Sequence, residues 1–389
     1  QLLVAVSERE LVDTPGFEDL VEYLGGHALA VELAGAFLGV YSAETPASYW
    51  AELKAGGGIE KEASDLVRYN QTVSQAFQTL WDRLDEEVRS AWRLASCFEP
   101  EPVTSALSDA VGLSLQNRRQ LQRLHLLEVD ADQRWWMHRL MREFGQQVGP
   151  SADFPFAQKA FIEGCAAFSK DIALSDGFRL YLPNRTHLDT AVRLAPEVLD
   201  REDSRISQFQ DRIGTALQSV GEFRLARELL EQALASALEN LGDSHPSVAI
   251  RRSNLALVLQ AQGDLEGAKV LLEQALASDL ENLGDSHPSV ARSRSNLATV
   301  LQAQGDLEGA KVLLEQALAS DLENLGDSHP SVAISRSSLA LVLQDQGDLD
   351  GARALARQAV KTASLQPEGS YVRTGVEAAM RGLLAGEDA

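Results

Sequence analysis

The sequence predicts an all-α protein with one small β-hairpin: a helical domain and a winged helix, followed by an α–α superhelix. Three observations support this fold class. A unit of 42 residues recurs in the second half of the chain, and apolar residues recur at helical spacing almost throughout. Alternation typical of β-strands is confined to one short segment near residue 130.

The repeat is most visible in the octet LGDSHPSV, which begins at Leu241 and recurs twice at intervals of 42 residues. The unit from Asp243 to Gly284 differs from the next unit at three positions only. Diverged copies lie on both sides, over residues 213–242 and 327–364. A unit of this length cannot cover its own apolar face, so the repeat predicts a solenoid of stacked units.

Each unit is predicted to contain two helices. Gly263 can adopt the left-handed conformation that ends the first helix, and Asp264 can cap the second. In the octet, Gly242 can end the preceding helix. Asp243 or Ser244 can then accept hydrogen bonds from the first turn of the next helix. The octet therefore predicts a loop that stops one helix and starts another.

His245, His287 and His329 recur with the octet. Packed helices lie about 8–10 Å apart and the next unit is two helices along, so these rings cannot share a metal ion with bonds of about 2 Å. We expect structural loop residues and no metal site. Cys97 and Cys165 lack any CxxC or Cys/His spacing, which predicts free thiols in a reducing, cytoplasmic compartment.

The apolar pattern of the units resembles the tetratricopeptide signature, and the 42-residue period resembles the kinesin-light-chain type of repeat. Arg252 replaces the aromatic residue that the family usually has early in the first helix, which predicts weaker packing at that point. The residues that carry the resemblance in one unit are Leu255, Ala256, Leu259, Gly263, Ala268, Leu272 and Ala275.

The resemblance implies that the first helices line a concave groove that holds a protein or peptide. Two of the three differences between the near-identical units, 250/292 and 257/299, fall on this face. Two plainer explanations stay open: these are ordinary solvated positions, or a recent duplication lengthened a spacer. The expected groove residues are Ile250, Ser253, Asn254, Leu257, Gln260, Arg292, Ser295, Asn296, Thr299, Gln302, Ile334, Ser337, Ser338, Leu341 and Gln344.

The first 150 residues lack such a period. Helical spacing and a Gly-Gly break at residues 25–26 predict several helices. Alternation at Leu127 and Val129, and again at Trp135 and Met137, surrounds a turn and predicts a hairpin followed by a helix. Helices closed by a hairpin predict a winged helix.

This part resembles the carboxyl end of the nucleotide-binding module of STAND-class signalling ATPases, the NB-ARC group. Residues 25–30, GGHALA, stand where that family has GLPLA, and Met137, His138 and Arg139 stand where it has MHD. The resemblance implies that Ala28 and His138 contact a nucleotide, with the histidine at the ADP diphosphate. Ala28 replaces the family's proline and Arg139 its acidic residue. His138 could equally be an ordinary core or surface histidine.

Neither a G-x-x-x-x-G-K-[ST] loop nor a catalytic motif such as G-x-S-x-G or H-E-x-x-H occurs. We therefore expect no enzyme activity and no cofactor in this chain, with ADP or ATP held by a parent protein. The first residue is Gln1, not Met, which predicts a fragment whose nucleotide-binding domain lies upstream.

The predicted organisation has five parts. These are a helical end of the NB-ARC-like module (1–65), a winged-helix domain (66–150), an irregular helical linker (151–204), a tetratricopeptide superhelix (205–364), and a cap helix with a tail (365–389).

The leading hypothesis is a non-catalytic regulatory and sensor segment of a bacterial-type STAND ATPase. A plain tetratricopeptide adaptor is the alternative, and a winged-helix DNA-binding regulator using Arg118, Arg119 and Arg123 is a third. The net charge of −22 argues against nucleic acid and anionic membranes as partners. The longest apolar stretch, residues 28–40, is too short to span a bilayer.

Overall fold

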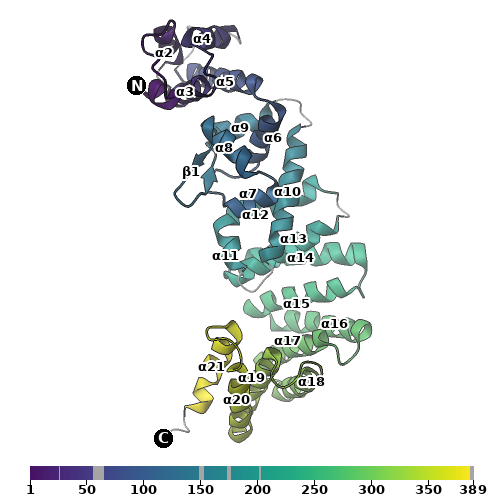
Figure 1. Ribbon diagram of the computed structural model, residues 1–389. Coiled ribbons are helices and arrows are strands. Elements are labelled where there is room, and N and C mark those ends of the chain that lie inside the picture. Colours follow the sequence, from purple (N-terminus) through teal and green to yellow (C-terminus); the bar gives the residue numbers. More distant parts are fainter. Residues whose placement is uncertain (26, 56–64, 149–152, 173–176, 201–202, 386–389) are drawn as a thin grey trace. The chain divides into compact units, whose positions relative to one another are not determined.

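The protein is described here from a computed structural model, which covers the chain except residues 26, 56–64, 149–152, 173–176, 201–202 and 386–389, and the side chains of 65–71. The described residues form helices and one two-stranded antiparallel sheet, which confirms the predicted fold class (Figure 1). They divide into two compact units, Gln1–Ile206 and Ser207–Ala389.

The first unit begins with short helices that precede a longer one. Helix α3 is apolar on nearly all sides, and Leu33, Phe37 and Leu38 are fully buried. Helix α5 contacts α3, α4 and α9. The helices are α1 (Leu2–Ser7), α2 (Phe17–Leu24), α3 (Ala28–Val40), α4 (Pro46–Ala55) and α5 (Asp65–Arg83).

The next segment closes with the predicted hairpin. Strands β1 (Glu128–Val129) and β2 (Trp135–Trp136) pair antiparallel, with Val129 opposite Trp135. An aromatic cluster joins three helices of this unit: Phe77 and Trp81 of α5 and Phe144 of α9 pack around Trp92 of α6. The helices are α6 (Glu86–Ala95), α7 (Ser105–Val111), α8 (Leu115–Arg123) and α9 (Arg139–Gln147).

The remainder of the first unit is built around a long helix. Helix α10 (Asp153–Ile172) contacts α6, α7 and α12 (Arg185–Val198). A Cβ on Gly164 would lie 2.4 Å from Cα of Val111, so the absence of a side chain permits the close approach of α10 to α7. Helices α11 (Phe178–Tyr181) and η1 (Leu182–Asn184) lead into α12.

The second unit is a stack of helical hairpins, closed by a last helix that contacts α19 and α20 (Figure 1). Gly263 adopts a φ of 84°, and Asp264 Oδ1 accepts a hydrogen bond from Gly267 N at 3.0 Å, as predicted. The helices are α13 (Ser204–Ser219), α14 (Phe223–Leu241), α15 (Pro246–Ala261), α16 (Leu265–Leu283), α17 (Pro288–Gln304), α18 (Leu307–Leu325), α19 (Pro330–Asp345), α20 (Leu349–Ala363) and α21 (Tyr371–Leu384).

Candidate functional site: the face of the first helices

The candidate groove lies on the first helices of the repeats, α15, α17 and α19. Their core positions are buried: Val248, Ala256 and Val258 are fully inaccessible to solvent. Helix α15 contacts α17, and α17 contacts α19, so the three helices form a row. Of the fifteen predicted groove residues, Ser337 alone is buried, at 6% exposed. The other fourteen are half-buried or exposed.

A hollow of about 370 Å³ lies between α17, α18 and α19. It brings together four of the predicted groove residues, Arg292, Ser295 and Asn296 from α17 and Ile334 from α19. Asp321 of α18 also lines it, and its Oδ2 accepts a hydrogen bond from Ser335 Oγ at 2.7 Å. The hollow therefore combines apolar surface, neutral polar groups and both signs of charge.

Polar side chains connect neighbouring first helices. Asn254 Nδ2 donates to Asp211 Oδ1 on α13 at 3.0 Å, and Gln302 Nε2 donates to Asp345 Oδ2 on α19 at 2.6 Å. Burial raises the pKa of Asp211, while the bond from Asn254 and the charge of Arg251 oppose that rise. Asn254 therefore has a structural role in addition to any contact with a ligand.

Acidic residues are nearly absent from the first helices α15, α17 and α19. Helices α15 and α17 contain no Asp or Glu, and α19 contains Asp345 alone, at its last residue. In contrast, the second helix α16 carries Glu266, Glu273, Asp279 and Glu281. Helices α15, α17 and α19 thus carry a single acidic residue, Asp345, in a protein whose net charge is −22.

The loops between the repeats differ in detail from the sequence prediction. The cap of each first helix is the histidine, not Asp243 or Ser244. His245 Nδ1 accepts from Ser247 N at 3.1 Å, and His287 and His329 do the same in their units. A histidine can serve as the helix cap because its ring nitrogen reaches the backbone N–H of the second residue of the helix. Among the described residues, no group of histidines, cysteines and carboxylates could hold a metal ion.

The prediction that Arg252 weakens packing was wrong. Arg252 is 5% exposed, and its guanidinium forms an ion pair with Asp243 and a hydrogen bond to the Asp243 carbonyl oxygen at 3.3 Å. Arg294 and Arg336 form the same ion pair with Asp285 and Asp327. At the position where the family has an aromatic residue, the arginine thus bonds the loop that precedes its own helix.

The two motifs of the first unit lie at helix starts. Ala28 is the exposed first residue of α3. His138 is exposed and caps α9, where its Nδ1 accepts from Leu140 N at 3.2 Å. Its Nε2 makes no hydrogen bond with the described residues. The neighbouring Arg139 pairs with Glu143 at 2.7 Å.

The three arginines of the predicted DNA-binding face do not form one surface. Arg118 is 7% exposed, and its guanidinium pairs with Asp109 Oδ1 at 2.9 Å and donates to the Ser105 carbonyl at 3.2 Å. Arg119 and Arg123 are exposed. A helix that reads phosphates needs free cations, so burial of Arg118 removes support for this alternative.

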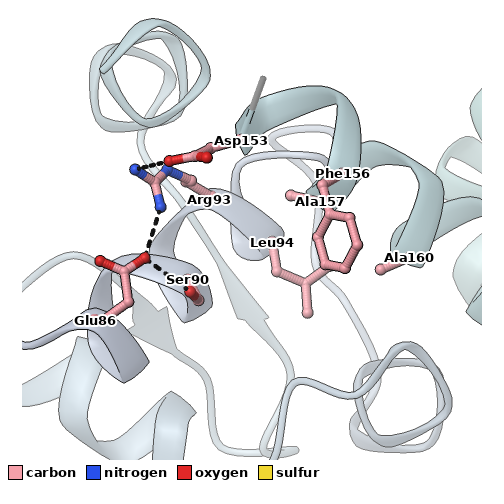
Figure 2. Close-up of a pocket in the computed structure, with 8 residues that line it drawn as sticks. All are labelled: Glu86, Ser90, Arg93, Leu94, Asp153, Phe156, Ala157 and Ala160. Atoms are coloured by element: carbon pink, nitrogen blue, oxygen red, sulfur yellow. Dashed lines mark hydrogen bonds and ion pairs between the residues drawn. The ribbon is translucent and has the colours of Figure 1, made fainter. Parts of the chain in front are cut away.

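A second hollow of about 250 Å³ lies between α6 and α10, and no sequence pattern pointed to it (Figure 2). Arg93 is 5% exposed there, with ion pairs to Glu86 at 3.1 Å and Asp153 at 2.7 Å. Its guanidinium also lies over Trp81. Two carboxylates already neutralise the arginine, so this hollow is not an anion site. Phe156 stands at its edge, 77% exposed.

The tetratricopeptide repeat family matches residues 205–281, 252–323 and 289–364. Among solved structures, a Podosopora anserina protein described as a kinesin light chain with nearly identical TPR-like repeats is 29% identical, covering 53% of this chain and 97% of its own, with a TM-score of 0.45. BtubC (BKLC) from P. vanneervenii is 20% identical, covering 69% and 97%, with a TM-score of 0.47. No curated protein matches.

Residues 205–364 are therefore tetratricopeptide repeats, stacked as a helical solenoid. Solenoids of this class are scaffolds for protein–protein interaction, because the regular rotation between units creates an extended binding surface. Among the described residues, no helix has the length and apolar character needed to cross a bilayer.

Proposed function

We propose that this chain is a non-catalytic regulatory and sensor segment of a STAND-type signalling ATPase. In this proposal the row of first helices binds a protein or peptide trigger. The first unit acts on a nucleotide-binding domain located upstream, in a cytoplasmic protein that holds ADP or ATP there. The five parts named from the sequence are retained as the proposed domain organisation.

The observation that supports the binding role best is the character of the row on α15, α17 and α19. Exposed apolar, amide and hydroxyl groups are gathered there, and acidic residues are almost absent. A packed core does not need exposed isoleucines such as Ile250 and Ile334. A surface with this mixture is typical of a site that binds another polypeptide.

The first unit supports the signalling role through the order of its motifs. GGHALA, residues 25–30, runs into the first turn of α3, and Met137, His138 and Arg139 follow the hairpin, with Arg139 as the first residue of α9. His138 is exposed, and its Nε2 makes no hydrogen bond with any residue that the structure describes, so this atom can donate to a phosphate oxygen. In this proposal, residues 66–150, which contain nearly all of α5, helices α6–α9 and the hairpin, form the winged-helix domain.

A stand-alone tetratricopeptide adaptor is the competing proposal, and one test separates the two. The coding sequence upstream of Gln1 should encode a phosphate-binding loop if the segment belongs to a signalling ATPase. Coiled-coil heptads there would favour the adaptor instead.

The groove is tested by affinity capture with the full chain and with the variant Asn254→Ala/Asn296→Ala. We expect the variant to lose a partner that the parent chain retains. Because Asn254 also bonds Asp211, the single variant Asn296→Ala serves as a second readout that leaves this contact intact. Equal capture by all three proteins would contradict the placement of the groove.

A further inference from the structure

Two positions of the row alternate in polarity from one repeat to the next. Ile250, Arg292 and Ile334 occupy one position on α15, α17 and α19, and Leu257, Thr299 and Leu341 occupy the other. The first repeat continues the pattern, since its equivalent residues on α13 are Gln208 and Thr215. Across α13, α15, α17 and α19 both positions are thus polar, apolar, polar and apolar in turn, with a period of two repeats.

Packing inside the solenoid does not explain the alternation at the first of these positions. Ile250 is 52% exposed and Ile334 is 45% exposed, so neither side chain fills the core. The third difference between the near-identical units, Arg251 against Ser293, does have an internal reason. Ser293 Oγ donates to the buried Asp279 Oδ2 at 2.6 Å, whereas the residue equivalent to Asp279 in the preceding unit is Ala237. The other two differences lie on the row: Ile250, Arg292 and Thr299 are exposed, and Leu257 is half-buried.

Arg292 is the cation at the centre of the row. It shares the hollow with Ile334, and its Nη2 donates to Ser289 Oγ at 3.4 Å. It forms no ion pair with the described residues. Asp321 in the same hollow is 6% exposed and already accepts from Ser335, whereas Arg292 is exposed. Helices α15, α17 and α19 carry two exposed charges. Arg292 lies in the hollow between two apolar positions, whereas Asp345 is the last residue of α19 and accepts a hydrogen bond from Gln302.

We propose that α15, α17 and α19 bind an extended peptide with one acidic side chain between two apolar side chains. One apolar side chain packs on Ile250 and Leu257, and the acidic one pairs with Arg292. The second apolar side chain packs on Ile334 and Leu341. This inference deepens the proposed function and rests on it, because it names the ligand of the same groove.

The spacing of the helices sets the spacing of the side chains. Because α15 contacts α17 and α17 contacts α19, the two apolar positions are two helix widths apart, roughly 16–20 Å at about 8–10 Å per pair. An extended chain advances about 3.3 Å per residue, so this distance corresponds to roughly five or six residues. The acidic residue falls between the two apolar ones.

Polar groups of the row favour an extended ligand over a helix. Ser253, Asn296 and Ser338 are half-buried, and their side chains form no hydrogen bond with the described residues. An extended segment exposes backbone N–H and C=O groups that need such partners. A helical ligand satisfies its own backbone groups and would leave these side chains unmatched.

The test is selection of phage-displayed random dodecapeptides on the full 389-residue chain, followed by affinity measurements on two exchange variants. Ile250→Arg/Leu257→Thr gives the second repeat the surface of the third. Arg292→Ile/Thr299→Leu does the reverse. Each new residue already stands at the equivalent position of a neighbouring repeat, so we expect both variants to fold. Val270→Ala, an exposed position on α16, is the control.

We expect the enriched peptides to carry an acidic residue between two apolar residues five or six apart. Ile250→Arg/Leu257→Thr should weaken their binding at least tenfold, and Val270→Ala should leave it unchanged. Replacement of the peptide's acid by its amide should cost at least fivefold with the parent chain and nothing with Arg292→Ile/Thr299→Leu.

Enriched peptides that lack this pattern would overturn this inference, and so would peptides whose binding neither exchange variant alters. Either result would still be compatible with a peptide-binding function of the chain. Failure of every peptide to be enriched would contradict the proposed binding function as well.

Discussion

The buried guanidinium of Arg252 forms an ion pair with Asp243 in the loop before its own helix, nine residues earlier in the chain. The same pair recurs as Arg294 with Asp285 and Arg336 with Asp327. Asn282 adds a second connection, because its Nδ2 donates to the Ser244 carbonyl oxygen at 2.7 Å. The loop of each octet is therefore bonded to both helices of the unit that follows it.

Removing the carboxylate of one such pair should destabilise the solenoid. Asp285→Ala leaves the 6%-exposed Arg294 with the backbone carbonyl as its remaining partner, and we expect the free energy of unfolding to fall by about 1–3 kcal/mol. Urea unfolding followed by far-ultraviolet circular dichroism measures this loss. Tryptophan fluorescence would not report on the solenoid, because all five tryptophans lie in the first unit. Glu281→Ala, at an exposed position, is the control. Equal stability of the two variants would contradict the role of the pair.

The buried Asp279 should depend on Ser293. Ser293→Ala removes the hydroxyl that donates to Asp279 Oδ2 and leaves a 7%-exposed carboxylate without that bond, which should cost about 1–3 kcal/mol. Adding Asp279→Ala removes the stranded carboxylate, so we expect the double variant to recover most of the loss. Independent, additive effects of the two substitutions would show that the bond does not matter.

The first unit should lose stability in acid through His187. Its Nδ1 accepts from Glu99 N at 3.3 Å and its Nε2 lies 3.4 Å from the Pro102 carbonyl oxygen, an arrangement that fits the neutral ring. Burial lowers the pKa of His187 to about 4 from the usual 6.5. The unfolded chain therefore takes up the proton first, and stability falls as the pH drops from about 6.5 towards 4, by up to roughly 3 kcal/mol.

Tryptophan fluorescence during urea unfolding at pH 7.5 and pH 4.5 measures this loss in the first unit. His187→Gln keeps a donor and an acceptor but does not titrate, so its stability should change less over the same interval. An identical pH dependence in both proteins would assign the effect to other groups.

The chain alone should neither bind nor hydrolyse ATP, because it contains no phosphate-binding loop. We expect millimolar ATP with Mg²⁺ to leave the melting temperature unchanged and to release no phosphate. A raised melting temperature or measurable turnover would place nucleotide chemistry within these residues, against the proposed division of roles.

The sequence predicted the solenoid well because its signals are local and repeated. Gly263 and Asp264 mark a turn by their own chemistry, and three copies of one octet give the same boundary three times. The hairpin around residues 130–133 was predicted for the same reason, since two alternating runs flank a turn.

The contacts that sequence reasoning missed depend on distances across the fold. Arg252 departs from the family pattern, and its pairing with Asp243 becomes visible only when helix and loop are placed together. Arg118 looked like part of a basic surface until α7 placed Asp109 beside it. The hollow around Arg93 is formed by α6 and α10, which are far apart in the chain, so no local pattern could indicate it.

The binding role of the first helices is tested most directly by photo-crosslinking in the cells that make the protein. A photoreactive residue at Thr299, exposed in the row, is compared with one at Val312, exposed on α18. We predict adducts with another polypeptide from position 299, and only background from position 312. Equal labelling from both positions, or labelling from position 312 alone, would contradict the account.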